Sequence, residues 1–351
     1  MEFADQLIFW YRKNKRDLPW RNTKDPYRIW LSEIILQQTR VVQGYSYYTN
    51  FIDTFPDVIR LASARETDVL KLWQGLGYYS RARNLHYTAK QIVEKYAGVF
   101  PQDYDEILQL KGIGVYTAAA IASFAFNKPY SVIDGNVYRV LSRLFGISTP
   151  IDKALGKKEF ATLAQALIPE NNPGEYNQAI MEFGALQCTP QSPDCSKCCF
   201  FVECEARKSA KIKELPIKEK KISKRVRFFN YLIIHHKDTL LIQQRGPGDI
   251  WQGLYEFPLF ESNAEASEVE VKNSPLWKSL FKKMSIPNFT KKKTEKHLLT
   301  HQTLHTTYWE ITVDDPAWNG FEKHFLKTPY QSITAHPFPR PIATYLEYLN
   351  L

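Results

Sequence analysis

Four cysteines lie close together in the chain and are well suited to bind a metal. They follow the spacing C-x6-C-x2-C-x5-C, at Cys188, Cys195, Cys198 and Cys204. Four thiolates at such spacing are typical of a metal site or an iron–sulfur cluster. Zinc sites usually bring two tight ligand pairs, but here only Cys195 and Cys198 form one. The spacing therefore favours a [4Fe–4S] cluster over zinc.

A pair of disulfide bridges is the third interpretation of the same cysteines. The N-terminal residues 1–16 contain no apolar core of the kind found in secretory signals. We therefore expect a cytoplasmic protein, and disulfides are rare in such a reducing compartment. The fifth cysteine, Cys199, is left over, and we expect it to have a packing role.

Glu33 is a carboxylate in an apolar setting. The periodicity of residues 27–38 predicts a helix that places Ile29, Trp30 and Leu36 beside it. Burial among apolar side chains raises the pKa of a carboxyl unless the group is paired. A carboxylic acid that stays protonated near neutral pH can act as a general acid. The alternative is a structural glutamate that reaches solvent or pairs with Arg40.

A Gly-x-Gly turn separates two predicted helices in residues 110–117, which read Leu-Lys-Gly-Ile-Gly-Val-Tyr-Thr. Glycine at Gly112 and Gly114 lets the backbone approach a ligand closely. The N–H groups at the start of the second helix can then bind a phosphate. This is the helix-hairpin-helix pattern of nucleic-acid-binding proteins, although such turns also occur for packing alone.

The elements that must position these residues change in character along the chain. Before about residue 205 the periodicity is helical. Helices are expected at 27–38, 67–72, 82–96, 106–110 and 116–126. The second half has strand and hairpin signals and ends in an amphipathic helix. Strands are expected at 225–235, 239–244, 254–260 and within 296–313, and the final helix at 339–351. We expect an all-α domain over 1–207, a basic linker over 208–226 and an α+β domain over 227–351.

The charge of the chain points to an anionic partner. The formal net charge is +9, and residues 207–227 hold ten Lys/Arg against two Asp/Glu. Such a segment is either a strap that follows DNA or a solvated linker. The hydrophobic content of 44% is ample for buried cores. No run of about 18 uncharged apolar residues occurs, so we expect no membrane-spanning helix and no membrane partner.

Taken in order, these motifs resemble the helix-hairpin-helix, iron–sulfur DNA glycosylases, and within them the A/G-specific adenine glycosylases. The matching stretches are Asp17-Leu-Pro-Trp-Arg21, Ser32-Glu-Ile-Ile-Leu-Gln-Gln-Thr-Arg40, Trp73-Gln-Gly-Leu-Gly-Tyr-Tyr-Ser-Arg81, the hairpin, Ile133-Asp-Gly-Asn136 and the four cysteines. The match is dense over the first 205 residues and thinner beyond, where the family carries a NUDIX-like domain. The resemblance implies a monomeric base-excision repair enzyme that removes adenine paired with 8-oxoguanine or guanine in double-stranded DNA. In a bacterium, such an enzyme would be associated with the nucleoid.

The resemblance assigns the chemistry to three side chains. It implies that Glu33 protonates N7 of the adenine. It places the catalytic aspartate at Asp134, where an anion would stabilise the positive charge that develops on the sugar. Asp134 could instead be only the N-cap of a helix predicted at 137–145, and both roles can hold at once. Tyr116 stands where endonuclease III-like relatives carry a lysine nucleophile, which implies a monofunctional glycosylase.

The same comparison assigns substrate-handling roles to the side chains around these three. Trp20 and Arg21 would lie near the adenine pocket. Gln38, Leu76 and Tyr78 would act at the base pair from which the adenine is flipped. The alternatives are core packing for Trp20, Leu76 and Tyr78, and a surface amide for Gln38.

The C-terminal half offers a candidate lesion-reading loop. The stretch Gly253-Leu-Tyr-Glu-Phe-Pro258 resembles the entry to a NUDIX core, but no R-E-x-x-E-E-x-G box follows, so pyrophosphate hydrolysis is not expected. The family reads 8-oxoguanine with a Phe-Ser-His loop, and the matching residues here are Leu299, Thr300 and His301. Thr300 keeps the hydroxyl and His301 keeps the ring. An ordinary strand histidine is the alternative for His301.

Two rival functions remain open. One is a thymine mismatch glycosylase on the same scaffold, which Glu33 and the full C-terminal half disfavour. The other is a DNA-binding scaffold without chemistry, which the presence of both Glu33 and Asp134 disfavours.

Overall fold

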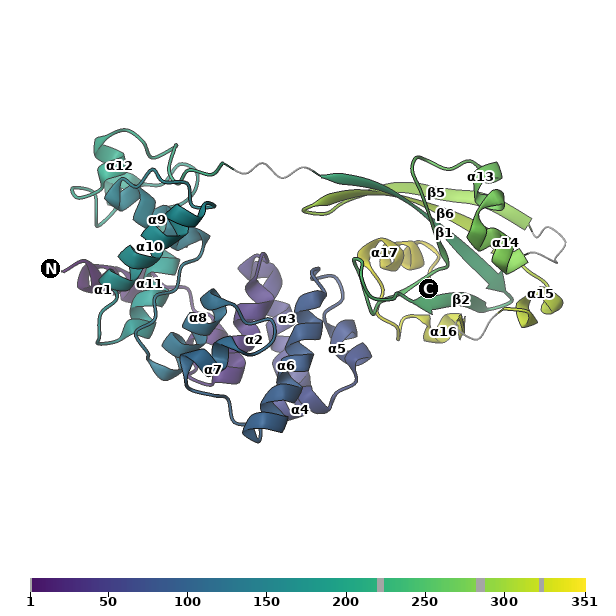
Figure 1. Cartoon of the computed structure of the whole chain (residues 1–351), viewed down its shortest axis with the longest axis horizontal. Coiled ribbons are helices and arrows are strands. Elements are labelled where there is room, and N and C mark those ends of the chain that lie inside the picture. Colours follow the sequence, from purple (N-terminus) through teal and green to yellow (C-terminus); the bar gives the residue numbers. More distant parts are fainter. Residues whose placement is uncertain (1, 220–223, 282–287, 322–324) are drawn as a thin grey trace. The chain divides into compact units, whose positions relative to one another are not determined.

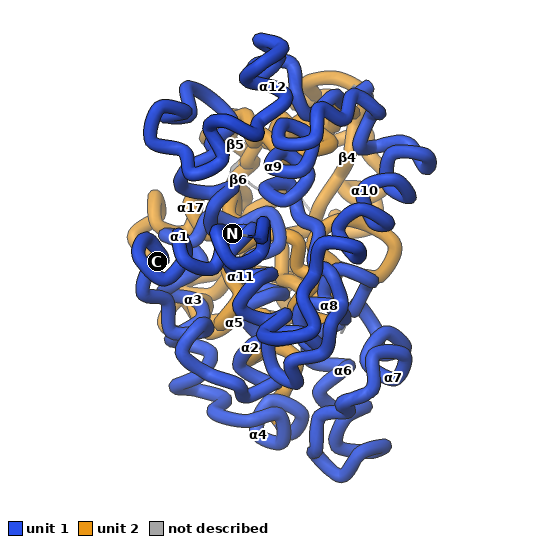
Figure 2. Tube along the Cα trace, turned by 90° about the vertical axis from the view of Figure 1, so that its left-hand side faces the viewer, with its two compact units in different colours: residues 1–63, 84–221 blue, residues 64–83, 222–351 orange. Residues whose placement is uncertain are grey.

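The chain forms two compact units in the computed structural model, which describes residues 2–219, 224–281, 288–321 and 325–351. The first unit contains Met1–Ser63 and Asn84–Lys221, and the second contains Ala64–Arg83 and Ile222–Leu351 (Figure 2). The second unit thus includes a segment from the helical half. The expected boundaries at 207 and 227 stay a prediction, although residues just past 207 pack on the first unit, where Leu215 is buried.

The first unit is helical (Figure 1). Its helices are α1 (Phe3–Asn14), α2 (Pro26–Leu36), α3 (Val41–Thr54), α4 (Val58–Ser63), most of α6 (Ser80–Tyr96), α7 (Tyr104–Leu108), α8 (Val115–Phe126), α9 (Gly135–Phe145), α10 (Ala154–Leu167), α11 (Pro173–Leu186) and α12 (Glu205–Lys208). Short 3-10 turns occur at Pro19–Arg21 and Cys195–Lys197. The all-α prediction for this half is confirmed.

The helix that carries Glu33 ends earlier than the sequence suggested. Asp25 caps α2 by accepting a hydrogen bond from the Tyr27 N–H, and Pro26 occupies the first turn, where no N–H partner is needed. The predicted end at residue 38 was wrong, because the backbone of Gln38 turns to a φ of 55°. This left-handed conformation is incompatible with a continuing helix.

The core of the first unit forms around α1, α9, α10 and α11, whose apolar side chains pack together with Phe200 from the cysteine-bearing loop. Helix α8 contacts both α2 and α11. Its small residues Ala118, Ala119, Ala120 and Ala122 are all buried. Small side chains let neighbouring helices approach closely. This packing brings the starts of α8 and α9 near the middle of α2.

The second unit is built on a mixed sheet. Its strands are β1 (Arg225–His236), β2 (Thr239–Gln244), β3 (Tyr255–Glu256), β4 (Leu259–Ser262), β5 (Asn288–Leu298), β6 (Gln302–Thr312) and β7 (Leu326–Pro329). The main order is β3-β2-β1-β6-β5, with β4 paired to β1 and β7 paired to β2. Strands β1 and β6 are parallel, and β1 and β2 form the predicted hairpin.

Both faces of this sheet are covered, and β1 shows how (Figure 1). Its side chains alternate, so that Leu232 and Ile234 join a cluster with α13 (Glu268–Asn273), α14 (Pro275–Phe281) and α15 (Asp315–Asn319). Phe229, Tyr231 and Ile233 face the other way. They pack with α16 (Tyr330–Ile333) and α17 (Arg340–Tyr348). Helix α5 (Glu66–Leu72) belongs to the same unit.

Two strand predictions needed correction. The single strand expected at 254–260 is two short strands, β3 and β4, separated by Phe257 and Pro258. Strand β5 starts well before the expected 296, in a lysine-rich stretch that has no apolar alternation. Lysines suit β5 because it lies at the edge of the sheet, where charge discourages pairing with other chains. Over the described residues, no helix has the length and apolarity needed to span a bilayer.

Candidate active site

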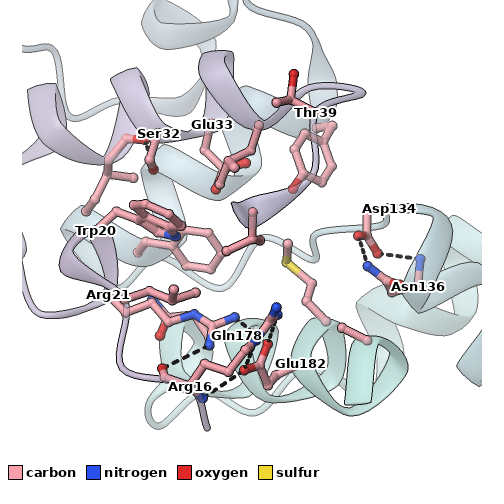
Figure 3. A pocket seen from close by; sticks show the side chains of 18 residues that line it. Arg16, Trp20, Arg21, Ser32, Glu33, Thr39, Asp134, Asn136, Gln178 and Glu182 are labelled. Atoms are coloured by element: carbon pink, nitrogen blue, oxygen red, sulfur yellow. Dashed lines mark hydrogen bonds and ion pairs between the residues drawn. The ribbon is translucent and has the colours of Figure 1, made fainter. Parts of the chain in front are cut away.

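A cavity of about 200 Å³ in the first unit contains the predicted catalytic residues. It is lined by Arg16, Leu18, Trp20, Arg21, Ile29, Ser32, Glu33, Leu36, Thr39, Val41, Tyr116, Phe124, Asp134, Asn136, Gln178, Met181, Glu182 and Ala185. Glu33, Arg21 and Asp134 come from different elements and lie on different walls (Figure 3). The fold thus gathers a buried acid, a second carboxylate and a guanidinium around one space.

Glu33 lies on α2 and is 8% exposed. Burial is the strongest influence on this side chain and raises the pKa of its carboxyl to about 7. A hydrogen bond donated by the Tyr116 hydroxyl acts in the opposite direction. The charge of Asp134 raises the pKa further and that of Arg21 lowers it. The alternative pairing with Arg40 is not what holds Glu33, since its partner is Tyr116.

Asp134 is the N-cap of α9. Its Oδ1 accepts hydrogen bonds from the N–H groups of Asn136 and Val137, both at 2.8 Å, and its Oδ2 accepts one from the Asn136 side chain at 2.6 Å. Burial raises the pKa of Asp134, while these three donors and nearby Arg139 lower it. Asp134 therefore caps a helix and also lines the cavity, so the structural role does not exclude the chemical one.

An ion-pair network that the sequence did not predict holds Arg21 at the cavity wall. The fully buried carboxylate of Glu182 accepts hydrogen bonds from Arg21 at 2.7 Å and from Arg16 at 2.6 and 2.9 Å. Burial alone would raise the pKa of Glu182, but these arginines lower it to about 2. Glu182 lies between Met181 and Phe183 in α11. This apolar setting was the available sign that its carboxylate is buried and paired.

Trp20 and Arg21 both lie in the cavity wall. The Trp20 ring is almost fully buried and packs against Tyr48 with ring centroids 5.2 Å apart. It therefore combines core packing with a face toward the cavity. Gln178 and Met181 of α11 also line the cavity and were missed, because the sequence of a helix does not indicate which cavity its residues face.

The Gly-x-Gly turn has the expected hairpin form. Gly112 has a φ of 78°, and a Cβ there would meet the Asn84 Cβ at 2.7 Å. Gly114 is the N-cap of α8 in extended backbone, and a Cβ on it would meet nothing within 4 Å. Only Gly112 is thus required by the chain's own conformation. The open space at Gly114 suits close approach of a ligand to the start of α8.

Gln38 and Tyr78 share an unusual backbone. Both have positive φ, 55° and 49° respectively, which is uncommon outside glycine and often marks functional sites. Gln38 is exposed in the first unit, and the Tyr78 side chain is 38% exposed in the second. Leu76 is 7% exposed, which agrees with its packing interpretation.

In the second unit, Tyr78 lies beside the candidate reading loop. The Tyr78 hydroxyl and Thr300 Oγ1 share a hydrogen bond of 2.5 Å. Thr300 and His301 are exposed and form the turn between β5 and β6. Together with Trp251 and other side chains they line a second pocket, within this unit. His301 is thus a turn residue rather than a strand histidine.

All five cysteines are free, which excludes the disulfide interpretation for this structure. The four predicted ligands, Cys188, Cys195, Cys198 and Cys204, line one small pocket, and Cys199 does not. Along the described chain, no three His, Cys, Asp or Glu side chains converge closely enough for a single metal ion. Four thiols that line one small pocket are a donor set that suits an iron–sulfur cluster.

Helix α9 connects this cage to the cavity. The Arg139 guanidinium donates to the Asn136 side chain at 2.8 Å and to the Cys188 carbonyl at 2.7 Å. One turn later, Arg143 donates to the Thr189 carbonyl at 2.7 Å and approaches Cys188 Sγ at 3.5 Å. Both arginines are buried. The same helix thus carries Asp134 at its start and grips the cysteine loop along its side.

Known proteins resemble this chain over most of its length. Residues 31–166 match the HhH-GPD superfamily of base excision DNA repair proteins, and residues 230–348 match the NUDIX domain. The adenine DNA glycosylase of Buchnera aphidicola subsp. Acyrthosiphon pisum is 38% identical over 265 residues, which are 75% of this chain and 76% of that protein. That of Buchnera aphidicola subsp. Schizaphis graminum is 34% identical and covers 86% and 85%.

The solved structures share the fold of the helical half. A thermostable thymine-DNA glycosylase superposes with a TM-score of 0.55 at 30% identity, over 59% of this chain and 95% of that one. Endonuclease III in a non-covalent DNA complex superposes with a TM-score of 0.51 at 21% identity and shows the fold alone. The chain belongs to the MutY-type adenine DNA glycosylase family and is a DNA glycosylase of base excision repair.

Proposed function

We propose that this enzyme removes adenine paired with 8-oxoguanine or guanine and leaves an abasic site without cutting the strand. The supporting observation is that Glu33, Tyr116 and Asp134 line one cavity, with Glu33 hydrogen-bonded to Tyr116. A buried acid with a pKa near 7 is suited to protonate a leaving base. A second carboxylate held by three hydrogen-bond donors is suited to stabilise the positive charge left on the sugar.

Glu33 supplies the proton. With a pKa of about 7, a sizeable fraction of its carboxyl is protonated at neutral pH. Proton transfer to N7 of a flipped-out adenine makes the base a neutral leaving group. The bond between the sugar C1′ and N9 then breaks, and its electron pair leaves with the adenine. The carboxylate left on Glu33 keeps its hydrogen bond from Tyr116.

Asp134 stabilises the sugar that remains. Loss of the base leaves positive charge on C1′ and the ring oxygen, and a nearby anion lowers the energy of that state. The donors on Asn136 and Val137 favour the ionised form of Asp134 and fix its orientation. Addition of water to C1′ completes the hydrolysis, and the proton released by the water passes to a carboxylate.

The absence of a lysine nucleophile supports a monofunctional reaction. Tyr116 occupies the position that holds a lysine in endonuclease III-like enzymes, and burial raises its pKa well above its ordinary value. None of the described residues that line the cavity is a lysine. Lys111, the nearby candidate, places its ammonium 4.2 Å from the Tyr87 ring centre. Borohydride should therefore trap no protein–DNA adduct.

Recognition of DNA follows from the remaining candidates. Trp20 and Arg21 would contact the flipped adenine. Gln38 and Tyr78 would fill or wedge the space that it leaves, and Leu76 would lie against the opposite base. The N–H groups around Gly112 and Gly114 would bind a phosphate of the double-stranded DNA. Thr300 and His301 would read the 8-oxoguanine. We propose that the protein acts as a monomer in the cytoplasm.

The cluster belongs to the same proposal. Cys188, Cys195, Cys198 and Cys204 would hold a [4Fe–4S] cluster, which cross-links a loop with few buried apolar side chains of its own. Arg143 and Arg207 also line the pocket, and their positive charges suit an anionic group. The residues of α9 then transmit the position of the loop to Asp134.

Substrate choice is tested with labelled duplexes that contain adenine opposite 8-oxoguanine, adenine opposite guanine, or thymine opposite guanine. After incubation, alkali cuts each abasic site. Strand cleavage at the adenine in the first two duplexes, and only after alkali, supports the proposal. Cleavage at thymine supports the thymine glycosylase instead, and no cleavage in any duplex supports a scaffold without chemistry.

A further inference from the structure

The segment Ala64–Arg83 belongs to the same compact unit as the C-terminal fold. This segment carries the candidate wedge residue Tyr78 and also Leu76, the candidate contact to the opposite base. Besides Tyr78, three of its side chains bond to the C-terminal backbone. The Lys71 ammonium donates to the His336 carbonyl at 3.3 Å, the Phe338 N–H donates to Gln74 Oε1 at 3.2 Å, and Arg83 Nη1 donates to the Gln252 carbonyl at 2.7 Å.

The bonds from Lys71 and Arg83 are charge-assisted, and the bond between Arg83 and Gln252 is the shortest of the three. The backbone beside it approaches the segment closely. Gly253 has a φ of 83°, and a Cβ on it would meet Leu70 Cδ1 at 3.2 Å and Arg83 Cδ at 3.9 Å. Only glycine suits both the conformation and the space. The backbone at Gly253 therefore lies directly against side chains of the segment.

The loop that Arg83 grips, residues 246–253, is braced from its other side. The carboxylate of Asp249 accepts hydrogen bonds from Arg227 at 2.6 and 2.7 Å and from Arg245 at 2.6 Å. Arg245 also donates to the Ile250 carbonyl at 2.8 Å. Arg227 and Arg245 are themselves almost fully buried. A loop held this firmly can transmit position from one neighbour to another.

The braced loop and the reading loop share one pocket. Asp249, Ile250 and Trp251 line it on one side, and Thr300 and His301 line it on another. Tyr78 and Arg83 also belong to its wall. The hydrogen bond between Tyr78 and Thr300 joins the wedge to the reading loop directly. Arg83 gives the segment a second connection to the reading loop, through Gln252 and the braced loop.

We propose that Arg83 is a positioning residue for the selectivity of the enzyme toward the base opposite the adenine. By gripping the Gln252 carbonyl it holds loop 246–253, the reading loop and Tyr78 in one arrangement. This inference rests on the proposed function, in which the C-terminal fold reads the opposite base. Arg83 lies outside the adenine cavity, so its loss leaves the hydrolysis itself intact and weakens only the discrimination.

The test compares Arg83→Met with Arg83→Lys and with Arg65→Met. Methionine keeps the apolar stem but removes the donor, and lysine restores a charged donor. Arg65 is a matched control, because it lies in the same segment and pairs with Asp68 on the surface. Single-turnover adenine excision is measured on duplexes with 8-oxoguanine and with guanine opposite the adenine. Hydrogen exchange of residues 246–253 is measured in parallel.

The expected result is a selective loss. Arg83→Met should lower the ratio of the rate on the 8-oxoguanine duplex to the rate on the guanine duplex by about tenfold, the scale of one charge-assisted hydrogen bond. It should also speed hydrogen exchange in loop 246–253. The rate on the guanine duplex should stay close to wild type. Arg83→Lys should recover most of the ratio, and Arg65→Met should change neither the ratio nor the exchange.

Two outcomes would overturn the inference alone: an unchanged ratio in Arg83→Met, or equal loss on both duplexes, which indicates a general structural role. Failure of the proposed function gives a different result. In that case the wild-type protein excises adenine from neither duplex, and the inference falls with it.

Discussion

The Tyr116 hydroxyl donates a hydrogen bond to the Glu33 carboxyl in the wall of the adenine cavity. The two residues come from different helices, α8 and α2. Neither the Gly-x-Gly hairpin nor the sequence around Glu33 indicates by itself that they are in contact. The bond favours the ionised carboxylate, while burial, the larger effect, favours the neutral acid and raises the Glu33 pKa to about 7. Tyr116 thus moderates an acid that burial alone would make weaker still.

Replacing Tyr116 with Phe should move the pH dependence of excision. Removal of the donor raises the Glu33 pKa further, so Glu33 stays protonated to higher pH. Excision by the wild type should fall as pH rises through about 7, and in Tyr116→Phe the fall should occur at higher pH. Single-turnover rates between pH 5 and 9 measure both profiles. Superimposable profiles would show that this hydrogen bond does not tune the acid.

Glu33→Gln should stabilise the fold at alkaline pH. A carboxyl whose pKa is raised from 4.5 to about 7 on folding destabilises the protein above pH 7, and the penalty disappears as pH falls below 4.5. The full penalty is about 3 kcal/mol. Urea unfolding should therefore show a gain for Glu33→Gln at pH 8 and none at pH 4.5. A gain in stability of equal size at both pH values would show that the effect comes from packing rather than from ionisation.

Glu182→Gln should show the opposite behaviour. The Glu182 pKa falls from 4.5 to about 2 on folding, so its contribution is complete above pH 4.5 and is lost as pH falls toward 2. Its loss should cost about 3 kcal/mol at pH 7, measured by the same urea titration. Because Arg21 loses its partner, excision should also weaken. Equal stability of variant and wild type at pH 7 would refute the network.

Asp134→Asn separates the helix cap from the chemistry. Asparagine is as good an N-cap as aspartate, so α9 and the overall stability should change little. The negative charge is lost, and excision should fall by at least about 100-fold. Circular dichroism and single-turnover kinetics on the same preparation give both readings. Parallel loss of helix and activity would indicate that Asp134 serves only as a cap.

Cys198→Ser and Cys199→Ser form a matched pair for the cluster. The wild-type protein should be brown, with broad absorption near roughly 400 nm from iron–sulfur charge transfer. Cys198→Ser should lose most of this absorption and unfold at lower temperature, whereas Cys199→Ser should keep both properties, because Cys199 lies outside the cage. Colourless wild-type protein that contains zinc would contradict the assignment.

The sequence predicted those helices, turns and hairpins that depend on residues close together in the chain. The periodicity around Glu33, the Gly112 turn and the β1–β2 hairpin all appear in the structure with small shifts in their ends. Strand β5 was missed over its lysine-rich part, because its stability comes from pairing with β6 rather than from apolar alternation.

The missed parts of the site depend on contacts between distant segments. Arg16 and Arg21 meet Glu182 only because α11 packs near the N-terminal segment. The grouping of Ala64–Arg83 with the C-terminal fold likewise depends on single hydrogen bonds to backbone carbonyls and amides, such as that from Arg83 to Gln252. Nothing in the spacing of these residues identifies their partners.

The central claim is that a buried, protonated Glu33 drives adenine release. Single-turnover excision by wild type and Glu33→Gln, on a duplex with adenine opposite 8-oxoguanine, tests it most directly when binding to the same duplex is measured alongside. The account predicts that Glu33→Gln binds the duplex as wild type does and releases no detectable adenine. Adenine release by Glu33→Gln at the wild-type rate would contradict it.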